Sequence, residues 1–140
     1  VDGDFPELGY FSLRELREVL RQPLEHPADQ CAAAQALVHS GQTEMVALSL
    51  GAQGAVLATR DGVWQAPAPD VSPARGTTGA GACFLAALVW SLARGAPPPD
   101  ALRWGMAAGA AALLVPGTAL AQATDVHRLQ SQVIVRASPV

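Results

Sequence analysis

Apolar residues recur at helical spacing in two stretches near the start of the chain. From residue 13 to 21, leucines recur three and four positions apart, and Ser12 followed by Glu15 fits a capping box, in which each side chain caps the other's backbone amide. From residue 28 to 39, apolar residues again mark one side, and Pro27 stands at a first helical position. We therefore predict two short helices joined by a turn.

Short apolar runs replace this spacing in the middle of the chain. Residues 45–50 and 55–59 are apolar and β-leaning, with a glycine turn at 51–54 between them. A third short run, 63–66, follows a hairpin turn signal at 61–62. The pattern predicts a strand, a tight turn, a second strand and a short third strand.

Helical spacing returns in the later part of the chain. An apolar decamer covers residues 84–93, and a second helix is expected over 101–114, capped at Asp100. A last amphipathic helix is expected from 124 to 133. Residues 1–11 have no usable period, so we expect them to form an irregular lead-in.

The predicted elements add up to an unbalanced fold. A strand pair with one short extra strand offers little sheet for five helices to cover. Either the strand count is wrong or the chain lacks the beginning of its fold. We therefore expect the carboxyl-terminal half of an α/β fold.

A glycine-rich stretch precedes the apolar decamer. Residues 76–81 read Gly-Thr-Thr-Gly-Ala-Gly, which does not form a stable helix and leads directly into one. Backbone amides and the positive end of the helix dipole then point at whatever lies in front, which is how proteins commonly bind anions. The glycines are equally compatible with a tight connection between a strand and a helix, so the local pattern leaves both interpretations open.

Composition narrows the classes of function. The 140 residues are 50% hydrophobic and 15% charged with a formal net charge of −3, which is a globular composition without the basic patch of a nucleic-acid or anionic-membrane binder. The longest apolar runs, 82–92 and 106–115, are shorter than the roughly 20 residues of a bilayer span. No secretory signal is recognisable, and only two cysteines occur. We expect a cytoplasmic chain with free thiols, and the three histidines share no zinc-ligand spacing with the cysteines.

Several motifs in fixed order resemble a known family. They are Ser-Leu-Gly-x-x-Gly-Ala at 49–55, a proline-rich connection, Thr-Thr-Gly-Ala-Gly at 77–81, and an alanine-rich helix ending at 116–118. This series is similar to the C-terminal portion of PfkB-type, ribokinase-like carbohydrate kinases. The nearest branch contains the minor 6-phosphofructokinase, 1-phosphofructokinase and tagatose-6-phosphate kinase. The resemblance implies a three-layer α/β/α fold whose nucleotide-binding portion occupies residues 12–140, with an unrelated segment at 1–11.

The resemblance assigns an anion hole and exposes a missing base. In the family, the amides that fall on Gly79, Ala80 and Gly81 receive the phosphate being transferred. The next family residue is an aspartate that acts as general base, and here that position is Ala82. Alanine accepts no proton, and loss of a positioned base commonly costs about 10²–10⁴-fold in rate.

The nucleotide side matches the family better. The resemblance implies ATP as cofactor, and in some relatives carbonyls corresponding to those near Gly76, Thr78, Val115 and Gly117 hold a monovalent cation. A hairpin turn explains Gly51 and Gly54 equally well. A core role is the alternative for Phe84, Met106 and Ala110. The implied nucleotide-binding residues are Ser49, Gly51, Gly54, Thr78, Phe84, Met106 and Ala110.

A magnesium motif is only partly present. The family uses Asn-x-x-Glu, preceded by Lys-Pro, to organise magnesium and phosphate. Ser12 stands in place of the Asn, Glu15 is kept, and Tyr10 and Phe11 replace the Lys-Pro pair. Glu15 is therefore the candidate for a metal role through Mg²⁺, and a pure capping role is the alternative.

Three functions follow from these observations. The resemblance implies phosphoryl transfer from MgATP to a hydroxyl of a phosphorylated sugar. The alternative is a truncated or degenerate remnant that keeps a nucleotide pocket without turnover, because the base is absent and the sugar-binding half and family dimer contacts would precede this region. A third interpretation, a non-catalytic interaction module, would use an exposed sheet edge. Neither nucleic acid nor membrane is an expected partner.

Overall fold

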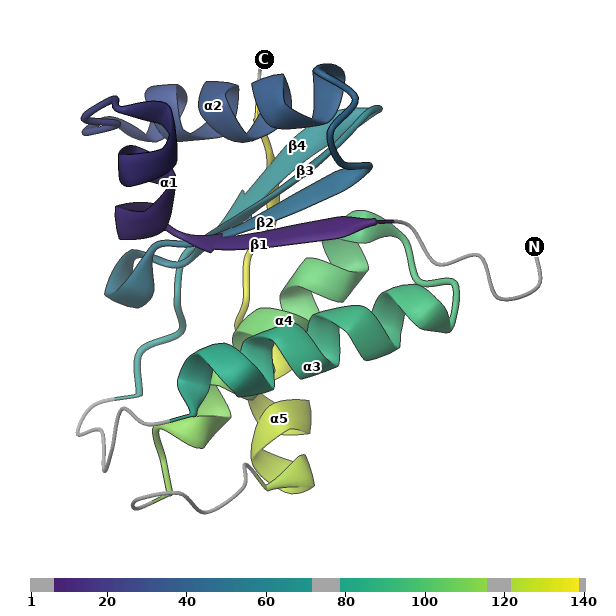
Figure 1. Ribbon diagram of the computed structural model, residues 1–140. Helices are drawn as coiled ribbons and strands as arrows, with labels where there is room; N and C mark the ends of the chain where they lie inside the picture. The colour runs from purple at the N-terminus through teal and green to yellow at the C-terminus, as the bar shows by residue number, and fades with distance from the viewer. Residues whose placement is uncertain (1–6, 72–78, 116–121, 139–140) are drawn as a thin grey trace.

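The computed structural model describes residues 7–71, 79–115 and 122–138 and shows an α/β protein (Figure 1). In chain order, its elements are β1 (Leu8–Ser12), α1 (Leu13–Leu20), α2 (Pro27–His39), β2 (Met45–Ser49), a 3-10 turn (Gly51–Gln53), β3 (Ala55–Thr59), β4 (Gly62–Ala66), α3 (Ala80–Ala93), α4 (Pro98–Ala112), α5 (Ala123–Gln130) and β5 (Arg136–Ala137).

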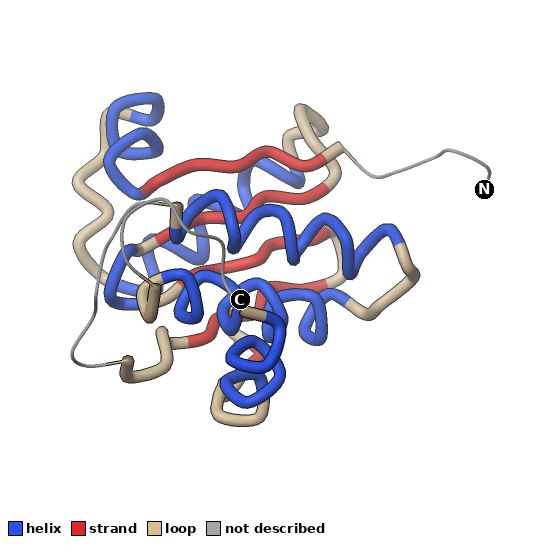
Figure 2. Tube along the Cα trace, turned by 90° about the horizontal axis from the view of Figure 1, so that it is seen from below, coloured by secondary structure: helices blue, strands red, loops and turns tan. Residues whose placement is uncertain are grey.

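The strands form one five-stranded sheet in the order β1-β2-β3-β4-β5. β1 and β2 are parallel, with Ser12 paired to Ser49 at their carboxyl ends. The remaining pairs are antiparallel, as the predicted turns between β2, β3 and β4 require. Figure 2 shows the strands side by side, seen from the side of α3, α4 and α5.

Helices cover both faces of the sheet, so the predicted three-layer α/β/α arrangement is confirmed. Side chains on a strand alternate between faces, and the wholly apolar run of β2 therefore supplies both cores. Val46 and Leu48 pack towards α1 and α2, whereas Met45 and Ala47 pack towards α3, α4 and α5. Each face of the sheet therefore contributes to a buried hydrophobic core.

The predicted irregular lead-in is wrong where the structure describes it. Leu8–Ser12 forms β1, paired in parallel with Met45–Ser49. The backbone hydrogen bonds that stabilise this strand come from a partner far along the chain, so no local period marks it. Residues 1–6 lie outside the described part of the chain.

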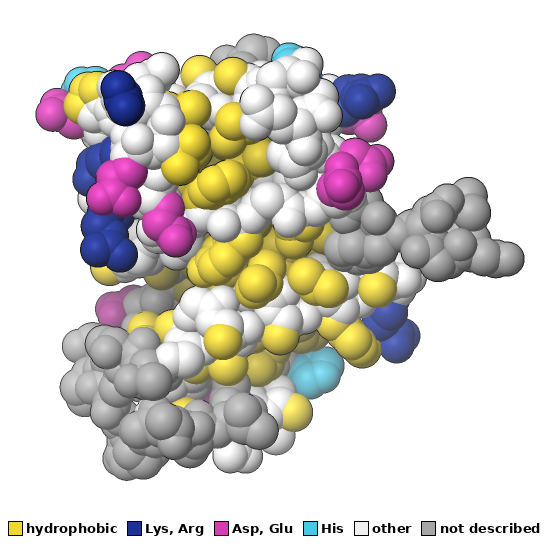
Figure 3. Space-filling view, in the orientation of Figure 1, with side chains coloured by type: hydrophobic (Ala, Val, Ile, Leu, Met, Phe, Trp, Pro, Cys, Tyr) yellow, Lys and Arg dark blue, Asp and Glu magenta, His cyan; other side chains and the backbone are white. Residues whose placement is uncertain are grey.

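Among the described strands, β1 and β5 form the two edges of the sheet, and β1 is the longer of them. β1 pairs only with β2, and its five residues are all partly exposed. Hydrophobic side chains gather around this edge and on α3 below it (Figure 3). Unpaired strand edges carry free backbone donors and acceptors.

The starts of α4 and α5 differ from the predictions. Pro97 is the N-cap of α4 and Pro98 its first residue, so Asp100 does not cap the helix but lies in its first turn and pairs with Arg103 at 2.6 Å. Proline fits there because the first helical amides need no intrahelical acceptor. α5 begins at Ala123, not at 124, and ends at Gln130.

No helix in the described ranges is long and apolar enough to cross a membrane. Both cysteines are free, with Cys31 buried in α2 and Cys83 partly buried in α3.

Candidate functional site

A cavity of about 340 Å³ lies where the end of β2 meets α3 and α4. We call it the glycine-lined cavity, because four glycines from three separate parts of the chain contribute to its wall. None of the described residues lining it is charged. They are Ser49, Gly51, Ala52, Gly54, Ala55, Ala80, Gly81, Phe84, Met106, Gly109, Ala110 and Leu113.

The first wall is the loop that follows β2. Gly51 and Gly54 have φ angles of 63° and 111°, which side-chain-bearing residues rarely adopt. A Cβ on Gly54 would lie 2.7 Å from the Pro67 Cα and closer still to the Ala66 carbonyl oxygen. The loop is closed by the Leu50 N–H, which donates to the Gly54 carbonyl at 2.8 Å. Glycine is therefore required here to bring the loop backbone against the end of β4.

The second wall is the N-terminus of α3. Gly79 is its N-cap, with a φ of 88°, and the helix begins at Ala80. The prediction that the glycine turn continues through residue 81 is therefore wrong, because Gly81 is already in the first helical turn. The Cys83 N–H donates to the Gly79 carbonyl at 2.9 Å, so the amides at 80–82 precede the first intrahelical bond. These amides and the helix dipole favour an anion in front of α3.

The third wall is α4, which approaches α3 closely. Phe84 of α3 is 5% exposed and lies between the two helices. A Cβ on Gly109 would lie 3.2 Å from the Ala80 carbonyl oxygen, which shows how near the two backbones are. Met106 and Ala110 line the cavity from the same helix and are also buried in the core. These residues are therefore part of both the cavity wall and the core, and a contact with adenine stays a prediction.

The structure brings together most of the predicted site residues. Eight of them line the glycine-lined cavity: Ser49, Gly51, Gly54, Ala80, Gly81, Phe84, Met106 and Ala110. Gly79 and Ala82 flank it in the same helical start, and Ala82 is exposed. Thr78 lies outside the described residues.

Sequence reasoning missed four of the lining residues. Ala52 lies inside the recognised loop, and Ala55 begins the strand that follows it. Leu113 is the C-cap of α4. Gly109 follows Gly105 by one helical turn, and this spacing of small residues was the available signal for close contact between helices.

Glu15 lies apart from the cavity wall, in the capping box of α1. The Ser12 N–H donates to Glu15 Oε1 at 2.8 Å, and the Glu15 N–H donates to Ser12 Oγ at 3.1 Å. The hydrogen bond from the Ser12 amide is the main cause that lowers the pKa of Glu15. Because Ser12 pairs with Ser49 of the cavity wall, this box lies at the carboxyl ends of β1 and β2, as the glycine-lined cavity does.

Metal-ligating groups are sparse in the described ranges. They hold no cluster of three or more His, Cys, Asp or Glu side chains suited to a metal ion. The Glu15 carboxylate is hydrogen-bonded within the capping box, and its metal role stays a prediction. The only protein oxygen that the sequence suggested for this purpose is the Glu15 carboxylate.

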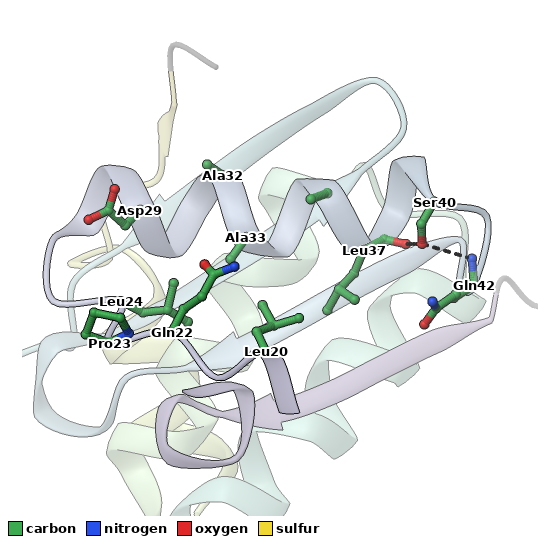
Figure 4. A pocket seen from close by; sticks show the side chains of 11 residues that line it. Leu20, Gln22, Pro23, Leu24, Asp29, Ala32, Ala33, Leu37, Ser40 and Gln42 are labelled. Carbon is green, nitrogen blue, oxygen red and sulfur yellow. Dashed lines mark hydrogen bonds between the residues drawn. The ribbon is translucent and has the colours of Figure 1, made fainter. Parts of the chain in front are cut away.

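Two further cavities are lined by described residues that include none of the predicted site residues. One, of about 440 Å³, lies between α1 and α2 (Figure 4). Its Ser40 hydroxyl already donates to the Leu37 carbonyl at 2.7 Å and accepts from the Gln42 N–H at 3.4 Å. The other, of about 520 Å³, lies between α3, α4 and α5, where Trp104 meets His127 edge-on with ring centroids 5.2 Å apart. Neither cavity includes residues of the glycine loops.

Comparison with protein families gives one match over most of the chain. Residues 7–125 match the model of the "pfkB family carbohydrate kinase". Among curated proteins, the chain is 43% identical over 117 residues to the ATP-dependent 6-phosphofructokinase isozyme 2 of Mycobacterium tuberculosis. That alignment covers 84% of this chain and 34% of the relative, so the chain spans about a third of the relative's length.

Solved structures show the same fold. Phosphofructokinase-2 from Escherichia coli, in complex with potassium and in complex with substrates and products, matches with a TM-score of 0.84 and 34% identity. The match covers 90% of this chain and 40% of that one. Ribokinase of Arabidopsis thaliana complexed with ribose and ATP, at 24% identity and a TM-score of 0.79, supports the fold alone.

Proposed function

Since the chain belongs to the pfkB family of carbohydrate kinases, we propose that it forms the nucleotide-binding part of an ATP-dependent phosphosugar kinase that works in the cytoplasm. The glycine-lined cavity receives the adenosine of ATP, and the phosphates extend to the N-terminus of α3. The observation that carries this proposal is the convergence of Ser49–Gly54, Ala80–Phe84 and Met106–Ala110 on one cavity.

The chemistry of the cavity suits a nucleoside. Small-molecule sites are commonly concave, mostly apolar and about 300–1,000 Å³ in volume. Phe84 and Met106 offer apolar surface to a flat base, while glycines at 51 and 54 let the loop backbone come close. The amides at the start of α3 supply donors for phosphate oxygens without any charged side chain.

The acceptor and metal ion are proposed from the family. A sugar phosphate is the acceptor that the names of the relatives indicate. Mg²⁺ would arrive bound to the ATP phosphates and offset their charge. The Glu15 carboxylate, at the carboxyl end of β1, is the candidate protein group near that ion. A monovalent cation is proposed at carbonyls of which Val115 alone lies within the described residues. The E. coli relative has been solved with potassium.

A second function is favoured by Ala82, namely nucleotide binding without phosphoryl transfer. The residue following the three proposed anion-hole positions carries only a methyl group and is exposed in the first turn of α3. A methyl group cannot take the proton from a sugar hydroxyl. The chain would then keep the cavity and lose turnover.

Calorimetric titration with ATP and with adenosine tests the binding proposal. Both ligands should bind, and Ala110→Leu should remove binding of both by filling the cavity. Ala36→Leu, the same change on the exposed side of α2, is the matched control and should leave binding unchanged. Circular dichroism checks that each variant is folded. No binding of either ligand at millimolar concentration would contradict the proposal.

A further inference from the structure

The cavity of about 520 Å³ between α3, α4 and α5 shares no lining residue with the glycine-lined cavity. Figure 1 shows α5 below α3 and α4, on the side away from the sheet. We call this space the tryptophan-lined cavity, because Trp90 of α3 and Trp104 of α4 both contribute to its wall. Its volume lies in the range that small-molecule sites commonly have, about 300–1,000 Å³.

Small side chains leave this space open. Residues three and four positions apart share one side of a helix, and Cys83, Ala87 and Trp90 of α3 line the cavity in this way. On α4, Ala108 follows Trp104 by four positions and lines it as well. Because residues 87 and 108 are alanines, the helices pack around a hollow that larger side chains would fill.

Two contacts hold the aromatic rings of the cavity. The guanidinium carbon of Arg94 lies 4.5 Å from the centroid of the Trp90 ring. Trp104 meets His127, another lining residue, edge-on with the centroids 5.2 Å apart. Trp90 is nevertheless 60% exposed. A large exposed ring beside a mostly apolar hollow offers the kind of surface that a flat ligand covers.

Ser91 gives the cavity a hydrogen-bonding group that the fold does not use. It lines the cavity, it is only 3% exposed, and its Oγ has no hydrogen-bond partner within the described structure. Serine inside a helix can donate to the carbonyl four residues earlier, which here belongs to Ala87, but this bond is not formed. Buried polar groups are nearly always hydrogen-bonded, so this exception needs an explanation.

We propose that the tryptophan-lined cavity binds an uncharged, flat and mostly apolar molecule, whose carbonyl oxygen accepts a hydrogen bond from the Ser91 hydroxyl. None of the described lining residues is Asp, Glu, Lys or Arg, so the wall favours a neutral ligand over an ion. Because Ser91 is almost fully buried, its hydroxyl exchanges no bound water for the ligand. This site does not depend on the proposed function.

Coumarin and naphthalene are suitable probes, because both are flat, uncharged and bicyclic but only coumarin has a carbonyl group. In nitrogen–proton correlation spectra, the indole signals of Trp90 and Trp104 should shift on titration with either probe. Trp64, in β4 and outside the cavity wall, provides an internal control whose signal should not shift. Adenosine should not displace coumarin.

Ser91→Ala tests the hydrogen bond, because it removes only the hydroxyl. It should weaken coumarin binding about two- to tenfold and leave naphthalene binding unchanged. Since the hydroxyl has no partner in the free protein, its removal should not lower the melting temperature. A serine with a purely structural role would show the opposite pattern.

Ala86→Leu tests the location. Ala86 lines the cavity and is exposed, so leucine there narrows the cavity without entering the core and should weaken binding of both probes. Ala93→Leu, the same change at an exposed position of α3 outside the cavity wall, is the matched control and should change neither affinity.

Different results overturn different parts of this inference. No shift of the Trp90 and Trp104 signals with either probe, or displacement of coumarin by adenosine, overturns the separate site. Equal weakening of both probes by Ser91→Ala, or a lower melting temperature of that variant, overturns the hydrogen bond. If the unmodified chain binds neither ATP nor adenosine but binds coumarin as described, the proposed function fails and this inference stands.

Discussion

The ring of Phe84 in α3 lies directly against Gly105 in α4. A Cβ on Gly105 would be 3.0 Å from Phe84 Cδ1 and 3.1 Å from the Phe84 carbonyl oxygen. The two helices can approach this closely only because α4 has no side chain there. Phe84 thereby forms both part of the core and part of the cavity wall.

Gly105→Ala should destabilise the protein although alanine favours helices. The gain in helix propensity is about 1 kcal/mol, while overpacking against Phe84 costs about 1–3 kcal/mol. We expect a net loss of free energy of unfolding of about 1 kcal/mol, measured by urea denaturation. Phe84→Leu in the same chain should relieve part of the loss. A Gly105→Ala protein more stable than the original would show that the helices are free to move apart.

Gly51 and Gly54 provide a matched pair with different predicted costs. Gly51 has a φ of 63°, and no atom lies within 4 Å of the place that a Cβ would take, so Gly51→Ala costs only what a left-handed backbone costs, about 1–2 kcal/mol. Gly54→Ala also forces a Cβ into the Ala66 and Pro67 backbone. Its loss of unfolding free energy should be at least about 3 kcal/mol, with loss of nucleotide binding. Similar denaturation midpoints for the two variants would contradict the described loop.

The sequence predicted best those elements whose stabilising signals are local. The capping box at Ser12 and Glu15 and the proline start of α2 occur as predicted, because a cap needs only residues three positions apart. The turn between β2 and β3 is similar, since its glycines are close together in sequence. Short-range hydrogen bonds and backbone angles decide all of these features.

Elements stabilised by distant partners were not predicted. β1 is recognisable only through its pairing with Met45–Ser49, and the two-residue β5 only through its pairing with β4. Both β5 residues are exposed, so no apolar pattern marks that strand.

The site was predicted through its motifs and not through its shape. The glycine loops and α3 residues came from the family resemblance, and the structure places eight of the predicted residues on one cavity. Gly109 and Leu113 were missed because their place in the wall depends on how α4 packs on α3. Contacts of this kind depend on three-dimensional packing and leave little trace in a local pattern.

The capping box predicts an effect of pH on stability. The pKa of Glu15 is lowered in the folded chain, so its ionised form is favoured by folding. This contribution is fully present above the unfolded pKa of Glu15 and is lost as pH falls through the lower folded value. Urea midpoints measured from pH 7 downwards should fall less steeply for Glu15→Gln, which keeps a capping amide without a charge.

Ser12→Ala is the companion to that measurement. It removes the acceptor for the Glu15 N–H and should cost about 1 kcal/mol at pH 7. Identical pH profiles of the original chain and the Glu15→Gln variant would show that the charge of Glu15 does not contribute to stability. The loss of unfolding free energy in Ser12→Ala would still be expected.

Ala82→Asp places a carboxylate at the position of the missing base. Ala82 is exposed in the first turn of α3, where the helix dipole favours a carboxylate by about 0.3–1 kcal/mol. The same charge beside the proposed phosphate site should weaken ATP binding in the absence of magnesium and leave adenosine binding unchanged. Ala86→Asp, further along the exposed side of α3, is the control and should change neither affinity.

In a coupled assay with MgATP and fructose 6-phosphate, we expect no phosphoryl transfer by the unmodified chain. Measurable transfer by that chain would show that Ala82 does not prevent catalysis, and the binding-only function would then be rejected.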